Sequence, residues 1–493
     1  MSWALPIGAA LLIGLTILAA ILLLSSRGTS KSGERQIDEA AGGGGGGGEA
    51  PQVVTEATAA MAASSPIPAT SRKTAKMPPK TTRHVTTTET TTTMKTTTMS
   101  STQMMTTTRA TTTTEKQTTT TTLRPLSPKS MLCVFGSTLD PKMTFPEDGL
   151  CDYSFFQAVE KEGLFLEGKS GGASLDAFTA MATKHSKTEY GISLDFKQYP
   201  AVKDAVSKPA AKKTVADLWK KKLYHWGYLS NPHFRLKPEV MSAQLEILRQ
   251  LKEIVDQVGK PPRTHYILYR ESSSTTRRMQ RNLKFMREIL WLDGFVLLTH
   301  MIDDDRRWAA GRILPPTFWL KFENSTGNYA YSLVTGHEAL DFFGREDMNG
   351  TALFLSATMN ARSYTPEGER KVYLATMKET NDTFFVSVVD YCKKSNYEFG
   401  FSDRNPVAPF YSSAKEKKFI AFDDSRSMAM KFCQGKKDHT SLKYGIAVFD
   451  VELDDWGNKC GKGAYERLKS VRKLVDYMNN NFTSPSGFKN CGK

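Results

Sequence analysis

The segment 293–300, with the sequence DGFVLLTH, holds the side chains whose types and spacing could do chemistry. Strand side chains alternate between two faces, so Val296, Leu298 and His300 share one face if the segment is a strand. On that face only the His300 imidazole can transfer a proton. We therefore consider His300 either a general acid or a core or rim histidine with a satisfied hydrogen bond, and we favour the second interpretation.

Three consecutive aspartates, Asp303, Asp304 and Asp305, follow this segment. If the strand continued, Asp303 would lie about 10 Å beyond position 300, at about 3.3 Å per residue. A turn could fold the trio back toward His300, but a run of like charges in a loop is ordinarily solvated. Consecutive aspartates cannot all face one ion without other ligands, so we expect no metal and no cofactor.

Strand-like runs alternate with helical patterns along the C-terminal three quarters of the chain. Apolar runs at 132–135, 190–194 and 266–269 are typical of strands, and 240–258 and 276–290 have apolar residues at helical spacing. Alternating β and α units indicate a parallel sheet, and their number predicts an α/β protein with a (β/α)8 TIM barrel over 131–493.

The N-terminus predicts a transmembrane signal anchor over 1–26. The apolar run 3–24 is long enough to span a bilayer and longer than a signal-peptide core of about 7–15 residues. Arg27, Lys31 and Arg35 follow the run, and by the positive-inside rule they oppose an extracellular barrel. The sequons and cysteines favour the extracellular side. A cleaved segment and a secreted protein remain the alternative.

A low-complexity segment occupies 27–130. Residues 42–48 are all glycine, and threonine dominates 81–122, with prolines on either side. Such a composition buries too little apolar surface to offset the entropy of folding. It predicts a disordered, O-glycosylated, mucin-like stalk. The alternative is an unglycosylated linker.

Other features of the chain also suit an exported protein. Six cysteines, an even number, suit three disulfides in an oxidising compartment: Cys133, Cys151, Cys392, Cys433, Cys460 and Cys491. Of fifteen possible connectivities we expect pairing between sequence neighbours. Four N-glycosylation sequons begin at Asn324, Asn349, Asn381 and Asn481. The net charge of +15 is dispersed along the 493 residues, and we expect no nucleic-acid partner.

Three C-terminal segments resemble motifs of the family 18 glycoside hydrolases, the chitinases. Residues 356–364 resemble G-x-P-x-Y-G-R-S-F, residues 422–431 resemble Y-D-D-x-x-S-x-x-x-K, and residues 445–456 resemble G-x-x-x-W-x-x-x-x-D-D-F. The placement of Cys133 and Cys151 also resembles the start of the family's barrel. These matches cover about 131–485 and keep the family's order.

The resemblance implies that segment 293–300 is the family's fourth barrel strand, D-G-x-D-x-D-x-E, with its last Glu as general acid. Asp293 matches, but Val296, Leu298 and His300 replace the two carboxylates and the acid. The family's substrate-assisted mechanism needs that acid and a second carboxylate. The resemblance therefore implies a degenerate site and a protein that does not hydrolyse sugar.

Binding without hydrolysis needs aromatic platforms and hydrogen-bonding groups in a groove. By the resemblance, Asn360 replaces a substrate-facing Tyr and Phe449 replaces a sugar-stacking Trp. The full set of candidates is Trp308, Trp319, Asn360, Arg362, Phe449 and Asp450. Three functions stay open: a membrane-anchored, non-catalytic protein that binds chitin or related glycans, a structural or protein-interaction module, and a glycosidase with a relocated acid.

Overall fold

The computed structural model describes residues 126–157, 165–195, 198–230, 238–258, 264–271, 276–289, 291–301, 311–320, 331–345, 348, 350–368, 372–378, 385–403 and 407–492. All of them belong to one compact unit, Thr111–Lys493. The expected anchor and most of the stalk lie outside the described residues, as do Trp308, the aspartates at 303–305, Asn324, Asn349 and Asn381. Among the described helices, none has both the length and the apolar character needed to cross a membrane.

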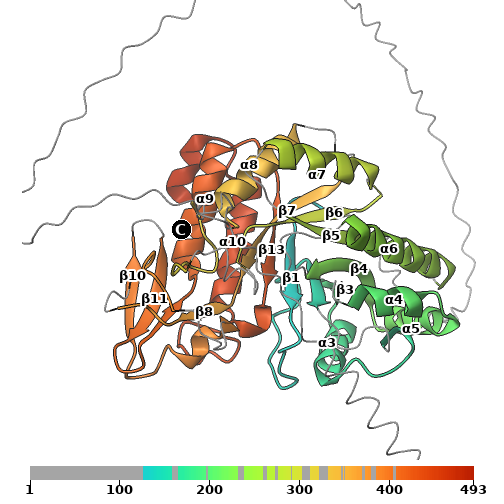
Figure 1. Ribbon diagram of the computed structural model, residues 1–493, viewed down its shortest axis with the longest axis horizontal. Helices are drawn as coiled ribbons and strands as arrows, with labels where there is room; N and C mark the ends of the chain where they lie inside the picture. Colours follow the sequence, from blue (N-terminus) through green and yellow to red (C-terminus); the bar gives the residue numbers. More distant parts are fainter. Residues whose placement is uncertain are drawn as a thin grey trace, which may run out of the picture. The chain divides into compact units, whose positions relative to one another are not determined.

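Eight parallel strands form a closed barrel (Figure 1). In chain order they are β1 (Met131–Phe135), β2 (Tyr153–Gln157), β3 (Glu189–Asp195), β4 (Leu223–Ser230), β5 (Tyr266–Glu271), β6 (Gly294–Leu298), β7 (Ala352–Thr358) and β13 (Gly445–Phe449). Each strand pairs with its neighbour in this order, and β13 closes the barrel against β1. The predicted strands at 132–135, 190–194 and 266–269 are confirmed.

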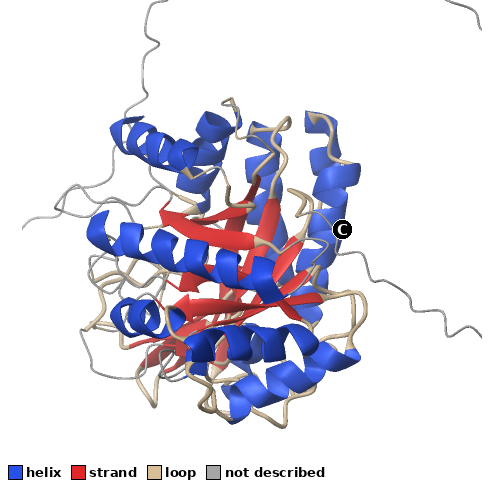
Figure 2. Cartoon of the chain, turned by 90° about the vertical axis from the view of Figure 1, so that its right-hand side faces the viewer, coloured by secondary structure: helices blue, strands red, loops and turns tan. Residues whose placement is uncertain are grey.

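Helices surround the strands (Figure 2). They are α3 (Ala173–Lys184), α4 (Tyr199–Val206), α5 (Pro209–Lys220), α6 (Pro238–Val258), α7 (Thr276–Glu288), α8 (Leu333–Gly344), α9 (Ser425–Asp438) and α10 (Glu466–Asn480). The two helices expected from apolar spacing correspond to α6 and α7. The barrel of alternating strands and helices confirms the predicted (β/α)8 fold.

Alternation along the strands divides the core into two parts. Inward side chains from seven of the eight strands fill the barrel: Leu132, Val134, Tyr153, Phe155, Leu229, Ile267, Val296, Ala352, Phe354, Ala447 and Phe449. The alternate side chains of the same strands, such as Phe295 and Leu297, belong to the larger core that includes the helices. Val296 therefore does extend the apolar packing of the barrel interior, where branched residues are usual.

A second, smaller sheet is inserted between β7 and α9. Its strands are β8 (Ala361–Tyr364), β9 (Phe385–Val386), β10 (Glu398–Ser402), β11 (Ala408–Ser413) and β12 (Lys418–Ala421). They lie in the order β10-β11-β12-β8-β9, and every pairing is antiparallel. Because β8 starts close after β7, the insertion continues directly from the C-terminal end of a barrel strand.

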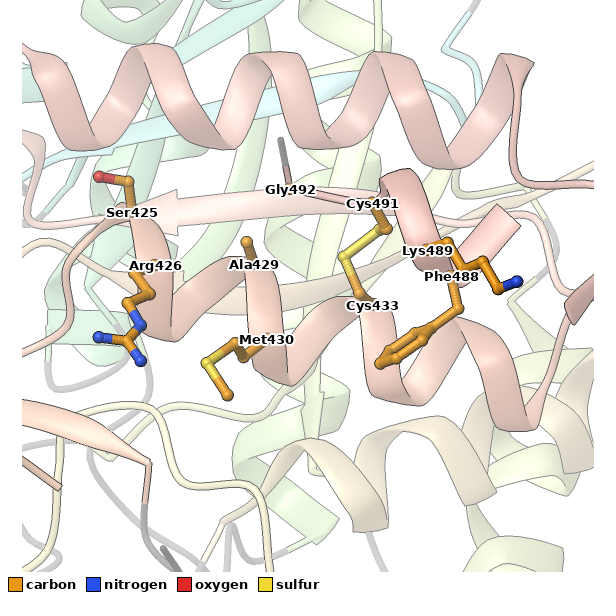
Figure 3. A pocket seen from close by; sticks show the side chains of 9 residues that line it. All are labelled: Ser425, Arg426, Ala429, Met430, Cys433, Phe488, Lys489, Cys491 and Gly492. Atoms are coloured by element: carbon orange, nitrogen blue, oxygen red, sulfur yellow. A yellow bond between two sulfur atoms is a disulfide. The ribbon is translucent and has the colours of Figure 1, made fainter. Parts of the chain in front are cut away.

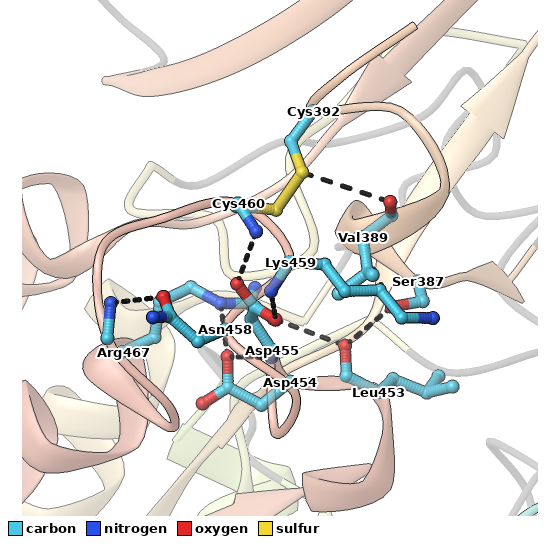
Figure 4. The surroundings of a disulfide bond; sticks show 11 residues. Ser387, Val389, Cys392, Leu453, Asp454, Asp455, Asn458, Lys459, Cys460 and Arg467 are labelled. Carbon is cyan, nitrogen blue, oxygen red and sulfur yellow. Dashed lines mark hydrogen bonds and ion pairs between the residues drawn. A yellow bond between two sulfur atoms is a disulfide. The ribbon is translucent and has the colours of Figure 1, made fainter.

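The expected disulfide pairing is wrong for two of the three bonds. Cys133 pairs with Cys151 as expected, but Cys433 on α9 pairs with Cys491 (Figure 3) and Cys392 pairs with Cys460 (Figure 4). The Cα atoms of both unexpected pairs lie within bonding range, at 5.9 and 5.6 Å. The fold decides the pairing, because it brings together cysteines that are 58 and 68 residues apart in sequence.

Cys392 instead meets the segment after β13. The hydroxyl of Ser387 donates to the Leu453 carbonyl over 3.0 Å, so the segment before Cys392 lies against the segment that leads to Cys460. The C-terminal residues return along α9, where Gly492 lies close to Ala429. Contacts between segments distant in sequence therefore set both bonds.

Candidate functional site

The expected position of the degenerate motif is wrong. Asp293 directly precedes β6, which is the sixth strand around the barrel and not the fourth. The fourth strand is β4, with the sequence LYHWGYLS, which contains no Asp or Glu. The conclusion that the fourth strand lacks carboxylates therefore holds, but for different residues from those in 293–300.

His300 is a buried histidine with satisfied bonds. Its Nδ1 lies 2.7 Å from Ser356 Oγ, and its ring lies against Phe449, with 4.7 Å between the ring centres. Burial, and secondarily the Arg362 guanidinium, lower the pKa of His300 to about 3. A neutral imidazole cannot supply the proton that leaving-group departure requires at neutral pH.

Leu298 is buried with Tyr269 and Tyr331. The two tyrosine hydroxyls lie 3.4 Å apart. Together with Val296, Leu298 gives β6 an apolar inward face up to His300. We find no carboxylate among these three positions, and their roles in the described structure are packing roles.

Four of the expected ligand-binding residues come together near the C-terminal ends of β6, β7 and β13. Asn360 Nδ2 donates to Asp450 Oδ2 over 2.9 Å, and Thr358 Oγ1 donates to the same oxygen over 2.5 Å. Phe449 lies next to Asp450 in sequence and contacts His300. Arg362 is close enough to His300 to influence its pKa, and it also contacts the Phe385 ring at 5.1 Å.

Three of these four residues are buried. Asn360, Arg362 and Phe449 are 1%, 0% and 4% exposed. The Asn360 Oδ1 atom has no hydrogen-bond partner among the described residues. Side chains this buried do not present a stacking platform to solvent.

Trp319 lies apart from this cluster. It is half-buried, packs against the barrel–helix core, and contacts His337 of α8 with 5.9 Å between ring centres. Backbone bonds from Leu333 and Val334 to the carbonyls of Phe318 and Trp319 fix the segment against the start of α8. Trp319 therefore packs on the outer core and lies outside the cluster of the other candidates.

The sequence did not single out Glu452, which lies in the short helix after β13. Its Oε2 accepts from the Gly136 N–H and its Oε1 from Thr138 Oγ1, each over 2.8 Å. Burial, and then the Asp450 carboxylate, raise the pKa of Glu452 to about 7. It lines a cavity of about 170 Å³ together with Trp456 and Asp455. The sequence feature that could have identified Glu452 is its position as an acidic residue directly after the last barrel strand.

The retained residues of the Y-D-D-x-x-S-x-x-x-K segment form a buried structural cluster. The Lys431 ammonium pairs with the Asp423 carboxylate and also donates to the Thr317 carbonyl over 2.6 Å. Asp423 further accepts from Ser427 Oγ and from the Thr317 N–H. Asp424 caps α9 through the Ser427 N–H. These residues connect α9 to the segment after β6.

The two aspartates of the third motif also hold the backbone in place. Asp454 pairs with Arg467 of α10 over 2.8 Å, while Asp455 accepts from the backbone N–H groups of Lys459 and Cys460 (Figure 4). The family-like residues that remain in this chain therefore have structural bonding roles in the described structure.

Glu189, His225 and His265 are the group among the described residues whose ligand atoms lie close enough together for a metal, within 4.8 Å. His225 Nδ1 accepts the His265 backbone N–H over 3.1 Å, so a neutral ring carries its proton on Nε2. That Nε2 faces Glu189 Oε2 at 3.1 Å. Metal ligation through Nε2 would need a doubly deprotonated ring, so the arrangement fits a hydrogen-bonded network and not a metal site.

Of the expected glycosylation sites, Asn481 falls in the described part of the chain. It directly follows α10 and is exposed, as is Thr483 of the same sequon. Its side chain is therefore accessible to a glycan in the folded protein.

No protein-family model and no curated protein matches the chain. Its structure is similar to the Group IV chitinase of Ostrinia furnacalis in complex with allosamidin, with a TM-score of 0.51, 13% identity, and coverage of 71% of this chain and 100% of that chain. It is also similar to the immunomodulatory active chitinase TsES1 of Trichuris suis, with a TM-score of 0.50, 13% identity, and coverage of 70% and 99%. The described part of the chain thus has a chitinase-like fold.

Proposed function

We propose that this protein is a non-hydrolytic chitinase-like protein that acts by binding. The observation that carries the proposal is the fourth barrel strand, β4, whose eight residues include no Asp or Glu. Hydrolysis in the family requires a carboxylic acid beside a second carboxylate. With neither on β4, the barrel remains as a scaffold without the group that protonates the leaving oxygen.

The cluster at the ends of β6, β7 and β13 favours a protein-interaction role over a sugar groove. Asn360, Arg362 and Phe449 are buried, and Asn360 bonds to Asp450. A saccharide needs exposed ring faces and free polar groups. Chitin binding stays as the second candidate, supported by the fold alone, and fold does not determine function.

One observation supports the glycosidase alternative. The pKa of Glu452 is raised to about 7, a value suited to a general acid near neutral pH. Both oxygens of Glu452 already accept hydrogen bonds from Gly136 and Thr138. Glu452 is therefore better explained as a buried brace between β1 and β13, and Glu452→Gln tests it directly.

Two assays on the full-length protein separate these functions. We expect no label release from a fluorogenic chitin oligosaccharide and no retention on chitin beads. Release that Glu452→Gln abolishes would establish the glycosidase. Retention that a soluble chitin oligosaccharide competes away, without release, would establish a sugar-binding protein and overturn the interaction role.

We also propose that the N-terminal segment anchors the protein and that the Thr-rich segment is a glycosylated stalk. The apolar run 3–24, the Thr tract and the exposed Asn481 support extracellular display. The protein should fractionate with membranes and shift in size after removal of N- and O-linked glycans. A soluble product of unchanged size would contradict this proposal.

A further inference from the structure

A cavity outside the barrel cluster lies along α9. It has a volume of about 780 Å³ and lies between α9 and the C-terminal residues. Its floor includes Met430, Phe488 and the Cys433–Cys491 disulfide, and Arg426 and Lys489 lie at its ends (Figure 3). We call this cavity the α9 groove.

The α9 groove exposes apolar surface. Met430 is 41% exposed, and it projects from the same side of α9 as Arg426, one helical turn away (Figure 3). A large apolar side chain exposed in a groove with other apolar lining residues marks an interaction site more often than an isolated one does.

Strand β10 continues this surface. The Arg426 guanidinium lies 4.1 Å from the centre of the Phe401 ring, so the groove and β10 meet at Arg426. Phe399 lies on the same face of β10 as Phe401, and it is 55% exposed. Phe399 also contacts Tyr411 of β11, with 5.6 Å between ring centres.

β10 is the terminal strand of its sheet and pairs with β11 among the described residues. A terminal strand presents backbone N–H and C=O groups that an added strand can pair with. Extended peptides bind proteins in this way, with backbone bonds providing affinity and pockets for alternate side chains providing specificity. The aromatic face of β10 and the α9 groove offer such pockets.

The charge of the groove favours an acidic partner. The lining residues that the structure describes include Arg426 and Lys489 and no Asp or Glu. At the start of α9, the Asp424 carboxylate accepts from the Ser427 N–H and the Glu466 carboxylate of α10 accepts from Ser425 Oγ. Lys437 adds a third cation, 4.9 Å from the Phe488 ring centre.

We propose that β10 and the α9 groove form a docking surface for an extended acidic segment of another protein. The segment pairs with β10 as an added strand, places a carboxylate against Arg426, and inserts an apolar side chain beside Met430 and Phe488. This surface does not include the barrel cluster, so the proposal stands whether or not the barrel binds or cleaves sugar.

The test uses fluorescence anisotropy with the full-length chain and a labelled peptide of about ten residues that alternates valine and glutamate. We expect saturable binding that weakens about tenfold or more in Arg426→Glu and in Met430→Glu, because each puts a negative charge in the groove. Lys213→Glu is the matched control, since Lys213 is an exposed cation on α5, and it should bind as the unmodified chain does. Thermal melting shows that each variant is folded.

Two further peptides test strand pairing and charge. A valine–lysine peptide should not bind, and a valine–glutamate peptide with alternate amides methylated should lose binding, because its N–H groups cannot pair. Hydrogen exchange of β10 should slow when the unmethylated peptide binds. Binding of the valine–lysine peptide or of the methylated peptide as tight as that of the valine–glutamate peptide, unchanged binding by Arg426→Glu, or an unprotected β10 would overturn the proposal.

The same experiments distinguish the acidic segment from other occupants of the docking surface. Concentration-dependent dimerisation that Arg426→Glu abolishes would identify a second copy of the chain as the occupant, which contradicts the proposal. Displacement of the peptide by a chitin oligosaccharide would identify the surface as a glycan site, with the same consequence. Binding of the peptide that neither dimerisation nor sugar affects is the supporting result.

Discussion

The Ser356 hydroxyl lies 2.7 Å from Nδ1 of His300, and this contact fixes the protonation of the ring. Ser356 Oγ accepts the backbone N–H groups of Thr299 and His300, over 2.7 and 3.3 Å, which uses both of its lone pairs and leaves its own proton for His300 Nδ1. When Nδ1 of a neutral imidazole accepts a hydrogen bond, the ring proton is on Nε2. The contact therefore stabilises the neutral imidazole, in agreement with the lowered pKa of His300.

Installing the family's carboxylates on β6 should not create a chitinase. The variant Val296→Asp, Leu298→Asp, His300→Glu places them on the sixth strand, whereas the family's catalytic residues belong to the fourth. Because Val296 and Leu298 are buried, two new buried carboxyls should cost several kcal/mol of stability. Urea unfolding and an oligosaccharide assay measure both effects, with Leu298→Met as the volume-conserving control. Hydrolysis by the triple variant would show that the barrel end can position substrate.

Acid should destabilise the protein between about pH 6.5 and 4.5. Burial lowers the pKa of His225 to about 4, of His300 to about 3 and of His337 to about 4. Each folded pKa lies below the unfolded value of about 6.5, so unfolding takes up protons and stability is lost as pH falls. Glu452 has the opposite effect on stability between pH 4.5, its reference pKa, and about pH 7. In this range the folded state holds the Glu452 proton and the unfolded state releases it, so stability rises as pH falls.

On unfolding, the three histidines take up three protons and Glu452 releases one, so the net uptake is about two protons. The free energy of unfolding should therefore fall by at most about 2.7 kcal/mol per pH unit on acidification. Urea titrations at several pH values measure this slope, and His300→Gln should reduce it by about one proton. A slope of zero across the window would contradict the burial of these histidines.

Lys431→Met should be strongly destabilising. It leaves the Asp423 carboxylate buried without its ammonium partner, and breaking a buried pair costs about 3–5 kcal/mol. The double variant Asp423→Asn, Lys431→Met should lose less than the single one, because no charge is left unpaired. The exposed pair of Lys252 and Asp256 supplies the control, and Lys252→Met should change stability by about 0.5 kcal/mol or less. Equal losses from both lysine variants would contradict the argument.

Gly435→Ala should destabilise the protein, although alanine is the better helix former. A Cβ at Gly435 would lie 2.2 Å from the His337 ring. That ring is held by the Leu333 carbonyl at 2.7 Å and the Tyr444 hydroxyl at 2.9 Å, so it cannot move without losing a bond. Overpacking of this kind costs about 1–3 kcal/mol.

The matched control is Gly344→Ala at the end of α8. There the nearest atom to an added Cβ is Leu442 Cδ2, at 3.3 Å, the end of a side chain that can yield. Thermal melting of both variants should lower the melting temperature for Gly435→Ala and leave it nearly unchanged for Gly344→Ala. A Gly435→Ala protein as stable as the control would show that the His337 ring is free to move.

The barrel was predictable because its strands and helices have regular apolar patterns. The two-residue alternation of strand side chains correctly placed Val296 on the inward face, and the apolar spacing within α6 predicted its helix. Strand β4 was missed because tyrosine, histidine and tryptophan interrupt its pattern directly after a lysine-rich helix. The motif was assigned to 293–300 because Asp293 and Gly294 resemble the start of D-G-x-D-x-D-x-E, but these residues lie at the start of β6.

The candidate site was less predictable than the fold. The sequence named Asn360, Arg362, Phe449 and Asp450, and the described structure brings them together, but it could not show that they are buried. Burial and bonding depend on which polar groups of distant segments meet, such as Thr358 with Asp450. Local spacing does not contain that information.

The order of two disulfides has a consequence for proteolysis. Cys392 pairs with Cys460 and Cys433 pairs with Cys491, so the two loops overlap in sequence. A single cut anywhere between Cys392 and Cys491 therefore leaves the fragments joined by at least one bond. Pairing between sequence neighbours would instead let one cut between Cys433 and Cys460 release a fragment. Strands β10 to β12 and helix α9 can thus be cut once while the fragments stay covalently joined until a reductant separates them.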